Sequence, residues 1–61
     1  MESKLKELRT QRHMSQQELA DASGVSRATI ANIELGTQKN IMTGTLIKLA
    51  DALGVPAREL V

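Results

Sequence analysis

The most constraining feature of the sequence is a very short connection between two segments with helical spacing. The segments cover about residues 16–23 and 27–35, and only Gly24-Val25-Ser26 separates them. A turn of this length cannot fold two helices back antiparallel, so it holds them at roughly 90–120°. The apolar residues that would then meet in one core are Leu19, Ala20, Val25, Ile30 and Ile33. A generic helical hairpin is the alternative, but it would not require these residue types at all of these offsets.

The ends of both helices carry capping residues. Ser15 and Glu18 are three residues apart and fit a capping box, in which each side chain accepts a hydrogen bond from the other residue's backbone amide. Gly24 follows the first helix, where glycine readily adopts the left-handed conformation that ends a helix. Ser26 precedes the second helix and Gly36 follows it. We therefore expect helices at 16–23 and 27–35.

The sequence predicts helices on both sides of this motif as well. Leucines three residues apart among basic side chains predict a short amphipathic helix at about 4–12. Apolar residues at helical spacing predict another at about 44–53, with Thr43 as its N-cap. A proline leaves room for only a short helical turn at 57–61. We expect an all-α, compact bundle of four to five short helices, formed by one domain that covers residues 1–61.

Composition excludes several other classes of protein. The chain has no cysteine, so neither disulfides nor thiolate metal ligands hold it together, and no aromatic residue contributes to its core. No apolar run approaches the roughly 20 residues of a membrane span, and no signal peptide follows the first residue, so we expect a cytoplasmic protein. The formal net charge of +1 says little about partners.

Catalytic and metal-binding patterns are absent from the sequence as well. The single histidine, His13, has no nucleophile motif beside it and no second ligand at metal spacing. There is no glycine-rich phosphate loop. We therefore expect no enzymatic activity, no catalytic residue, no metal and no cofactor.

Residues 4–60 resemble the lambda-repressor-like (XRE) helix-turn-helix family. The resemblance is carried by three stretches: Ser15-Gln16-Gln17-Glu18-Leu19-Ala20, Gly24-Val25-Ser26-Arg27-Ala28-Thr29-Ile30 and Ile33-Glu34-Leu35-Gly36. The chain departs from the family pattern at His13, where glycine is usual. It also departs in the loop 37–43, which is about one residue longer than is common and lacks the usual proline. The resemblance implies the same fold and a DNA-binding function.

The second helix of the motif would be the DNA reader. At 100° per residue, Ile30 and Ile33 define its inward side, while Ala28 and Asn32 point outward and Arg27 lies on the flank. Arginine can pair with guanine O6 and N7, asparagine with adenine N6 and N7, and alanine can touch a thymine methyl group. With the resemblance, these chemistries make Arg27, Ala28 and Asn32 candidate base contacts. The alternative is that all three are simply solvated helix positions.

Backbone contacts are expected beside this helix. The positive end of helix 16–23 suits a phosphate, and the resemblance favours Gln16 as its ligand. Further candidates, each of which could instead be a solvated side chain, are Gln17, Thr29, Gln38 and Lys39. The resemblance also implies a structural ion pair between Arg9 and Glu34.

We expect a sequence-specific transcription regulator, more a repressor than an activator, that binds double-stranded DNA as a homodimer on a palindromic operator. The surface for dimerisation would comprise Leu53, Val55, Pro56, Arg58 and Leu60. A further protein domain or protein partner could strengthen the dimer. The alternative function is a protein-interaction module of the same fold, as in antitoxin subunits and coactivators, and the near-neutral charge favours it mildly.

Overall fold

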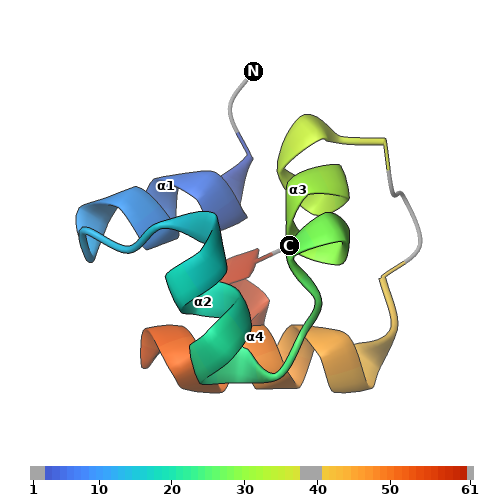
Figure 1. Ribbon diagram of the computed structural model, residues 1–61. Coiled ribbons are helices and arrows are strands. Elements are labelled where there is room, and N and C mark those ends of the chain that lie inside the picture. Colours follow the sequence, from blue (N-terminus) through green and yellow to red (C-terminus); the bar gives the residue numbers. More distant parts are fainter. Residues whose placement is uncertain (1–2, 38–40, 61) are drawn as a thin grey trace.

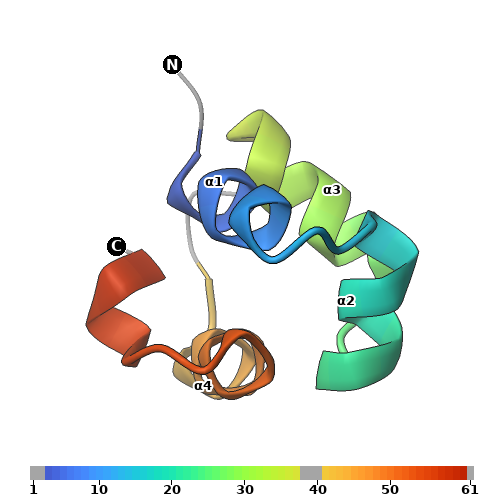
Figure 2. The same ribbon diagram turned by 90° about the vertical axis from the view of Figure 1, so that its left-hand side faces the viewer.

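The computed structural model describes residues 3–37 and 41–60, which form an all-α bundle (Figure 1). Its elements, in chain order, are the helices α1 (Lys4–Gln11), α2 (Gln16–Ser23), α3 (Arg27–Leu35) and α4 (Thr43–Leu53) and the 3-10 helix η1 (Ala57–Leu60). Helix α4 packs against α2 and η1, while α1 packs against α3 and η1. In Figure 2, α1 and α4 are seen nearly end-on, with η1 on one side and α2 and α3 on the other. Within the described residues, no helix is long and apolar enough to cross a membrane.

The predicted capping residues fix the ends of α2 and α3. The Glu18 amide donates to the Ser15 hydroxyl at 3.0 Å, and the Ser15 amide donates to the Glu18 carboxylate at 2.8 Å, which completes the capping box. The Ser26 hydroxyl accepts from the Thr29 amide at 3.1 Å. Each bond satisfies an amide that a helix terminus would otherwise leave without a partner.

The start of α4 differs from the sequence expectation by one residue. Thr43 is the first residue of the helix and not its cap, because the carbonyl of Met42 already accepts the first helical bond, from the Leu46 amide at 3.0 Å. Met42 makes no side-chain capping bond. Helix α1 likewise ends at Gln11, with Arg12 as its C-cap.

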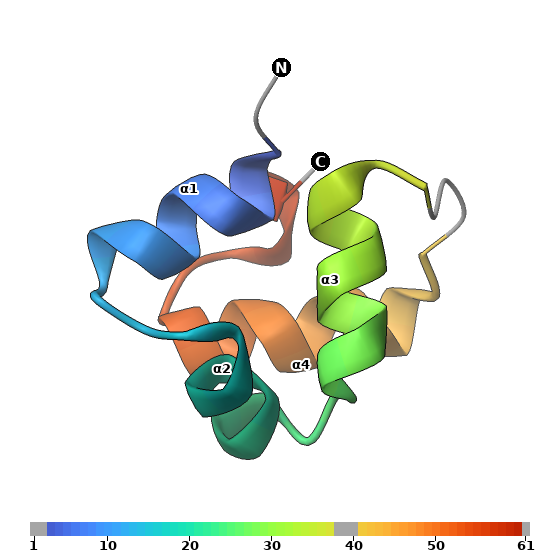
Figure 3. The same ribbon diagram turned by 45° about the horizontal axis from the view of Figure 1, so that its top comes forward.

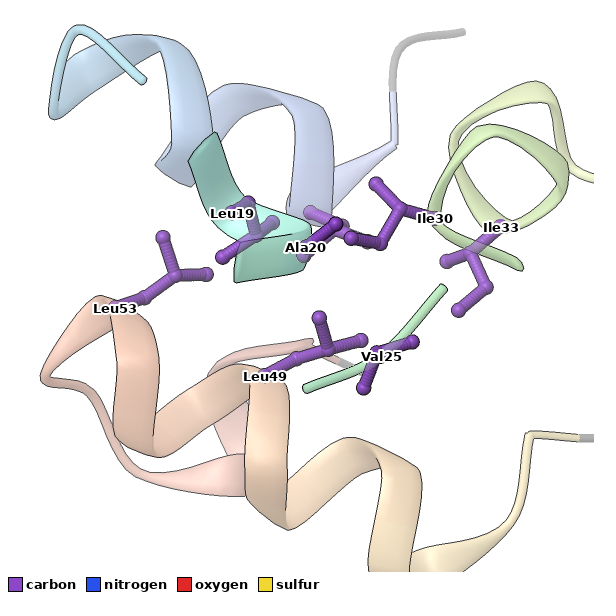
Figure 4. Close-up of a cluster of buried hydrophobic side chains, with 8 residues drawn as sticks. Leu19, Ala20, Val25, Ile30, Ile33, Leu49 and Leu53 are labelled. Carbon is purple, nitrogen blue, oxygen red and sulfur yellow. The ribbon is translucent and has the colours of Figure 1, made fainter. Parts of the chain in front are cut away.

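The core lies where α2, α3 and α4 meet, and it is built from aliphatic side chains alone (Figure 4). Its largest fully buried members are Leu19, Ile30 and Leu49. Among residues 3–37 and 41–60, the buried ones are Leu5, Leu19, Ala20, Val25, Ile30, Ile33, Leu49, Ala50 and Leu53. Burial of Leu53 corrects one expectation: its side chain belongs to the core, so it contributes nothing to a dimer surface.

His13 has a backbone conformation that side chains rarely adopt. Its φ is 55°, and among the described residues it is the one non-glycine residue with a positive φ. The Met14 amide donates to the Arg9 carbonyl at 3.2 Å and the His13 amide to the Thr10 carbonyl at 3.0 Å, the two bonds of a Schellman motif. Helix α3 ends with the same pair of bonds, but there Gly36 occupies the left-handed position with φ 80°. His13 therefore ends α1 in the left-handed conformation that Gly36 adopts at the end of α3.

We expect His13→Gly to raise the free energy of unfolding by about 0.5–1 kcal/mol. A left-handed conformation costs an L-residue about 1–2 kcal/mol and glycine almost nothing, but glycine loses more conformational entropy on folding, which offsets roughly 0.5–1 kcal/mol of that gain. Urea unfolding followed by circular dichroism at 222 nm measures the change. His13→Ala is the control, because it removes the imidazole and keeps the Cβ atom. If His13→Ala stabilises the chain as much as His13→Gly, the imidazole and not the backbone is the source of the strain.

Candidate nucleic-acid interface

The turn between α2 and α3 is held by local contacts. Gly24 ends α2 with φ 76°, and its amide donates to the Ala20 carbonyl at 2.9 Å. The Val25 amide donates to the Ser23 hydroxyl at 3.1 Å, and the Val25 side chain is buried. Figure 3 shows the result: α2 and α3 cross each other and do not run side by side. The turn thereby fixes which side of α3 faces away from the core.

Helix α3 has a clear division between a buried and an exposed side. Ile30 and Ile33 are buried in the core. The residues at the opposite side, Ala28, Asn32 and Leu35, are exposed, and Arg27 is exposed in the first turn. All three expected base-contacting residues, Arg27, Ala28 and Asn32, are therefore accessible from solvent. The surface that they form is narrow, because alanine and asparagine are short.

Arg9 and Glu34 form a bidentate ion pair that joins α1 to α3. The Arg9 Nε donates to Glu34 Oε2 at 2.7 Å, and a terminal nitrogen donates to Oε1 at 3.0 Å. The other terminal nitrogen donates to the Met14 carbonyl. The two side chains are only 11% and 5% exposed. Such a shielded, two-bond geometry is among the stronger kinds of ion pair in proteins.

Gln16 belongs to the same network. Its Nε2 donates to Glu34 Oε1 at 3.1 Å, so the carboxylate receives bonds from α1 and from the first residue of α2. Burial alone raises the pKa of Glu34, but the hydrogen bonds from Arg9 and Gln16 and the charges of Arg9 and Lys6 outweigh it and lower that pKa below its ordinary value. The hydrogen bond to Glu34 raises the pKa of Arg9, against the effect of its burial. Sequence reasoning proposed Gln16 only as a phosphate ligand and missed this contact.

The other candidate backbone residues have different surroundings. The Gln17 Nε2 donates to the Asp21 carboxylate at 3.0 Å on the exposed side of α2. The Thr29 hydroxyl accepts from the Ser26 hydroxyl at 2.8 Å and is half-buried. Gln38 and Lys39 lie outside the described residues.

An open pocket of about 300 Å³ lies between α1, α2 and α3, beside the exposed side of α3. Its lining residues are Lys6, Arg9, Gln16, Ala31, Glu34 and Leu35. Lys6 is exposed and lines the pocket from α1. Leu35 is 76% exposed at the pocket's rim. In the described part of the chain, no cluster of histidine and acidic side chains is suited to a metal ion.

Two short helices that share a buried core across a tight turn, the second with an open outer side, define a helix-turn-helix protein. A family model described as Helix-turn-helix matches residues 5–60. The chain belongs to this family, the lambda-repressor-like (XRE) family that its motifs resemble.

Similar proteins include two regulators. The chain is 42% identical over 59 residues to the cryptic phage CTXphi transcriptional repressor RstR of Vibrio cholerae, covering 97% of this chain and 52% of that protein. It is 43% identical over 56 residues to the uncharacterized HTH-type transcriptional regulator RghRB of Bacillus subtilis (strain 168), covering 92% of this chain and 40% of that protein. The chain thus spans about half the length, or less, of these relatives.

A solved structure is similar as well. The restriction-modification controller protein C.AhdI from Aeromonas hydrophila matches with a TM-score of 0.88 and 40% identity, over 95% of this chain and 86% of that one. The match confirms the all-α fold predicted from the sequence. None of these descriptions is that of an enzyme, in agreement with the expectation from the residue inventory.

Proposed function

We propose that this chain is a sequence-specific transcription regulator, acting as a repressor, that reads the major groove of DNA with α3. The observation that carries the proposal is the division of α3, with Ile30 and Ile33 in the core and Ala28 and Asn32 open to solvent. A helix about 10–12 Å across fits a major groove about 12 Å wide, provided that the side chains that enter first are small. The similarity to a repressor, a transcriptional regulator and a controller protein supports this function.

Each exposed residue of α3 has a role that suits its chemistry. Arg27 donates two bonds to guanine, Asn32 exchanges two bonds with adenine, and Ala28 contacts a thymine methyl group. Flanking phosphates are bound by Gln16, Gln17, Thr29, Gln38 and Lys39. The Arg9–Glu34 pair touches no base in this scheme, and it sets the position of α3 relative to α1.

The regulator binds as a homodimer on a palindromic operator. One α3 reads only a few base pairs, so useful specificity requires two of them about 34 Å apart, facing successive turns of the major groove. The segment that follows α4, together with η1, supplies the dimer surface, where Pro56 and Arg58 are exposed and Val55 and Leu60 are half-buried.

Selection of bound duplexes from a random library tests this function. We expect the wild-type chain to enrich a palindrome. Arg27→Ala and Asn32→Ala should each lose discrimination at particular positions of the half-site, by about 5- to 150-fold, the equivalent of 1–3 kcal/mol. Arg12→Ala is the matched control, because it removes an exposed arginine outside α3. Uniform weakening at every position would instead assign Arg27 and Asn32 to phosphate contacts.

A protein-interaction module remains the second candidate, because the net charge is only +1. Salt dependence separates the two functions. With about six phosphate contacts per dimer, the logarithm of the DNA association constant falls against the logarithm of salt concentration with a slope of roughly −4 to −6. A protein-interaction module gives no such slope and no enriched duplex.

A further inference from the structure

We propose that the pocket between α1, α2 and α3 receives one sugar–phosphate unit of the DNA backbone. In this scheme Lys6 and Gln16 hold the phosphate, and Leu35 packs against the deoxyribose. The inference rests on the proposed DNA-binding function and deepens it, because it adds two contact residues that the sequence motifs do not indicate.

The position of the pocket identifies the part of DNA that would reach it. Ala31 and Leu35 line it from α3, on the same helix as the exposed Ala28 and Asn32. When a helix fills the major groove, the two walls beside it are sugar–phosphate strands. A pocket that borders the exposed side of α3 therefore meets a strand and not a base edge.

The charges around the pocket suit an anion. Arg9 and Glu34 neutralise each other in their ion pair, and the exposed Lys6 adds one positive charge. Lys6 lies near enough for its charge to act on the Glu34 carboxylate. Gln16 uses one amide hydrogen on Glu34, and the second hydrogen on the same nitrogen remains for another acceptor. Glu34 thereby holds the Gln16 amide in one orientation beside the lysine.

Leu35 supplies the apolar part of the site. Its side chain is 76% exposed, although leucine is usually withdrawn from water, and it stands at the rim of the pocket next to Ala31. A deoxyribose ring presents carbon atoms on its outer side, so contact with the ring would remove both apolar surfaces from water. The polar residues Lys6 and Gln16 suit the phosphate of one nucleotide, and the apolar Leu35 suits its deoxyribose.

Measurement of DNA affinity against salt concentration, with the duplex that the wild-type chain selects, tests the proposal. Lys6→Gln should weaken binding equally on selected and random duplexes and make the log–log slope less negative by about 0.9 per protomer. Lys4→Gln is the matched control, because it removes the same charge from an exposed position of α1 that does not line the pocket. Leu35→Ala should weaken binding several-fold, leave the slope unchanged and leave the base preferences unchanged.

Three results would overturn the proposal, and they are distinguishable. If Lys6→Gln and Lys4→Gln change the slope equally while the wild-type chain still selects a palindrome, the pocket holds no phosphate but the DNA-binding function stands. If Leu35→Ala alters the preference at particular base positions, Leu35 contacts a base and not a sugar. If the wild-type chain binds no duplex, both the pocket assignment and the proposed function are wrong.

Discussion

Glu34→Gln is expected to lower the free energy of unfolding by about 3–5 kcal/mol, because it leaves the shielded Arg9 guanidinium without a countercharge. The substitution also weakens the bonds that the carboxylate accepts from Arg9 and Gln16. A chain of this length has a total stability of roughly 3–9 kcal/mol, so much of the variant should be unfolded at 25 °C. Urea unfolding followed by circular dichroism measures the loss.

The dependence of this effect on pH follows from the lowered pKa of Glu34. A carboxylate with a depressed pKa in the folded state contributes its full stability above the ordinary glutamate value of about 4.3. That contribution is lost as the pH falls through the lower folded value. The wild-type chain should therefore lose stability in acid more steeply than Glu34→Gln does.

Two further variants control for other effects of the substitution. Glu7→Gln removes an exposed carboxylate from α1 and should change stability by less than about 0.5 kcal/mol. The double variant Arg9→Met/Glu34→Leu removes both charges, so it should recover most of the loss and remain measurable if Glu34→Gln does not fold. If Glu34→Gln is as mild as Glu7→Gln, the ion pair does not hold α1 to α3.

Leu49→Ala is expected to cost about 2–5 kcal/mol, because it opens a cavity at a fully buried position of α4. Figure 4 shows Leu49 directed toward the side chains of α2 and α3. The core holds no large ring that could shift into the space, and its members are short aliphatic side chains. The midpoint temperature of thermal unfolding, measured at several protein concentrations, reports this loss of stability.

Ile47→Ala is the matched control for this cavity, because Ile47 lies two residues away on α4 and is 47% exposed. We expect it to cost less than about 1 kcal/mol, since most surface substitutions have small effects. If Leu49→Ala and Ile47→Ala lower the free energy of unfolding equally, the side of α4 that carries Ile47 also packs against α2. Loss of DNA binding in Leu49→Ala at temperatures where it is folded would also contradict a purely structural role.

Local hydrogen bonding explains why the helices could be predicted from the sequence. Ser15 with Glu18 and Ser26 each satisfy amides within three residues of themselves, so residue types alone indicate where α2 and α3 begin. Helix α4 lacks such a side chain at its cap, and Thr43 looked like one although the helix begins there. The first helical hydrogen bond of α4 is accepted by the backbone carbonyl of Met42. Because every residue has a backbone carbonyl, the sequence gives no sign of where this helix begins.

The site was predictable to the extent that it depends on one helix. The exposure of Arg27, Ala28 and Asn32 follows from the 3.6-residue period and the burial of Ile30. The contact of Gln16 with Glu34, and the pocket that includes Lys6, depend on how α1 crosses α2 and α3. That crossing is set by contacts between residues 18 to 25 positions apart, such as Gln16 with Glu34 and Arg9 with Glu34, which no local pattern encodes. Contact with DNA at any of these residues stays a prediction.

The two-sided character of α3 has a consequence for how such a chain can diverge over time. Ile30, Ile33 and Glu34 tie the helix to its neighbours, while Ala28 and Asn32 are exposed. Mutations at these two positions should therefore be nearly neutral for folding. Descendant copies of the gene could acquire new operators through one or two codon changes, without first having to rebuild the scaffold that presents them.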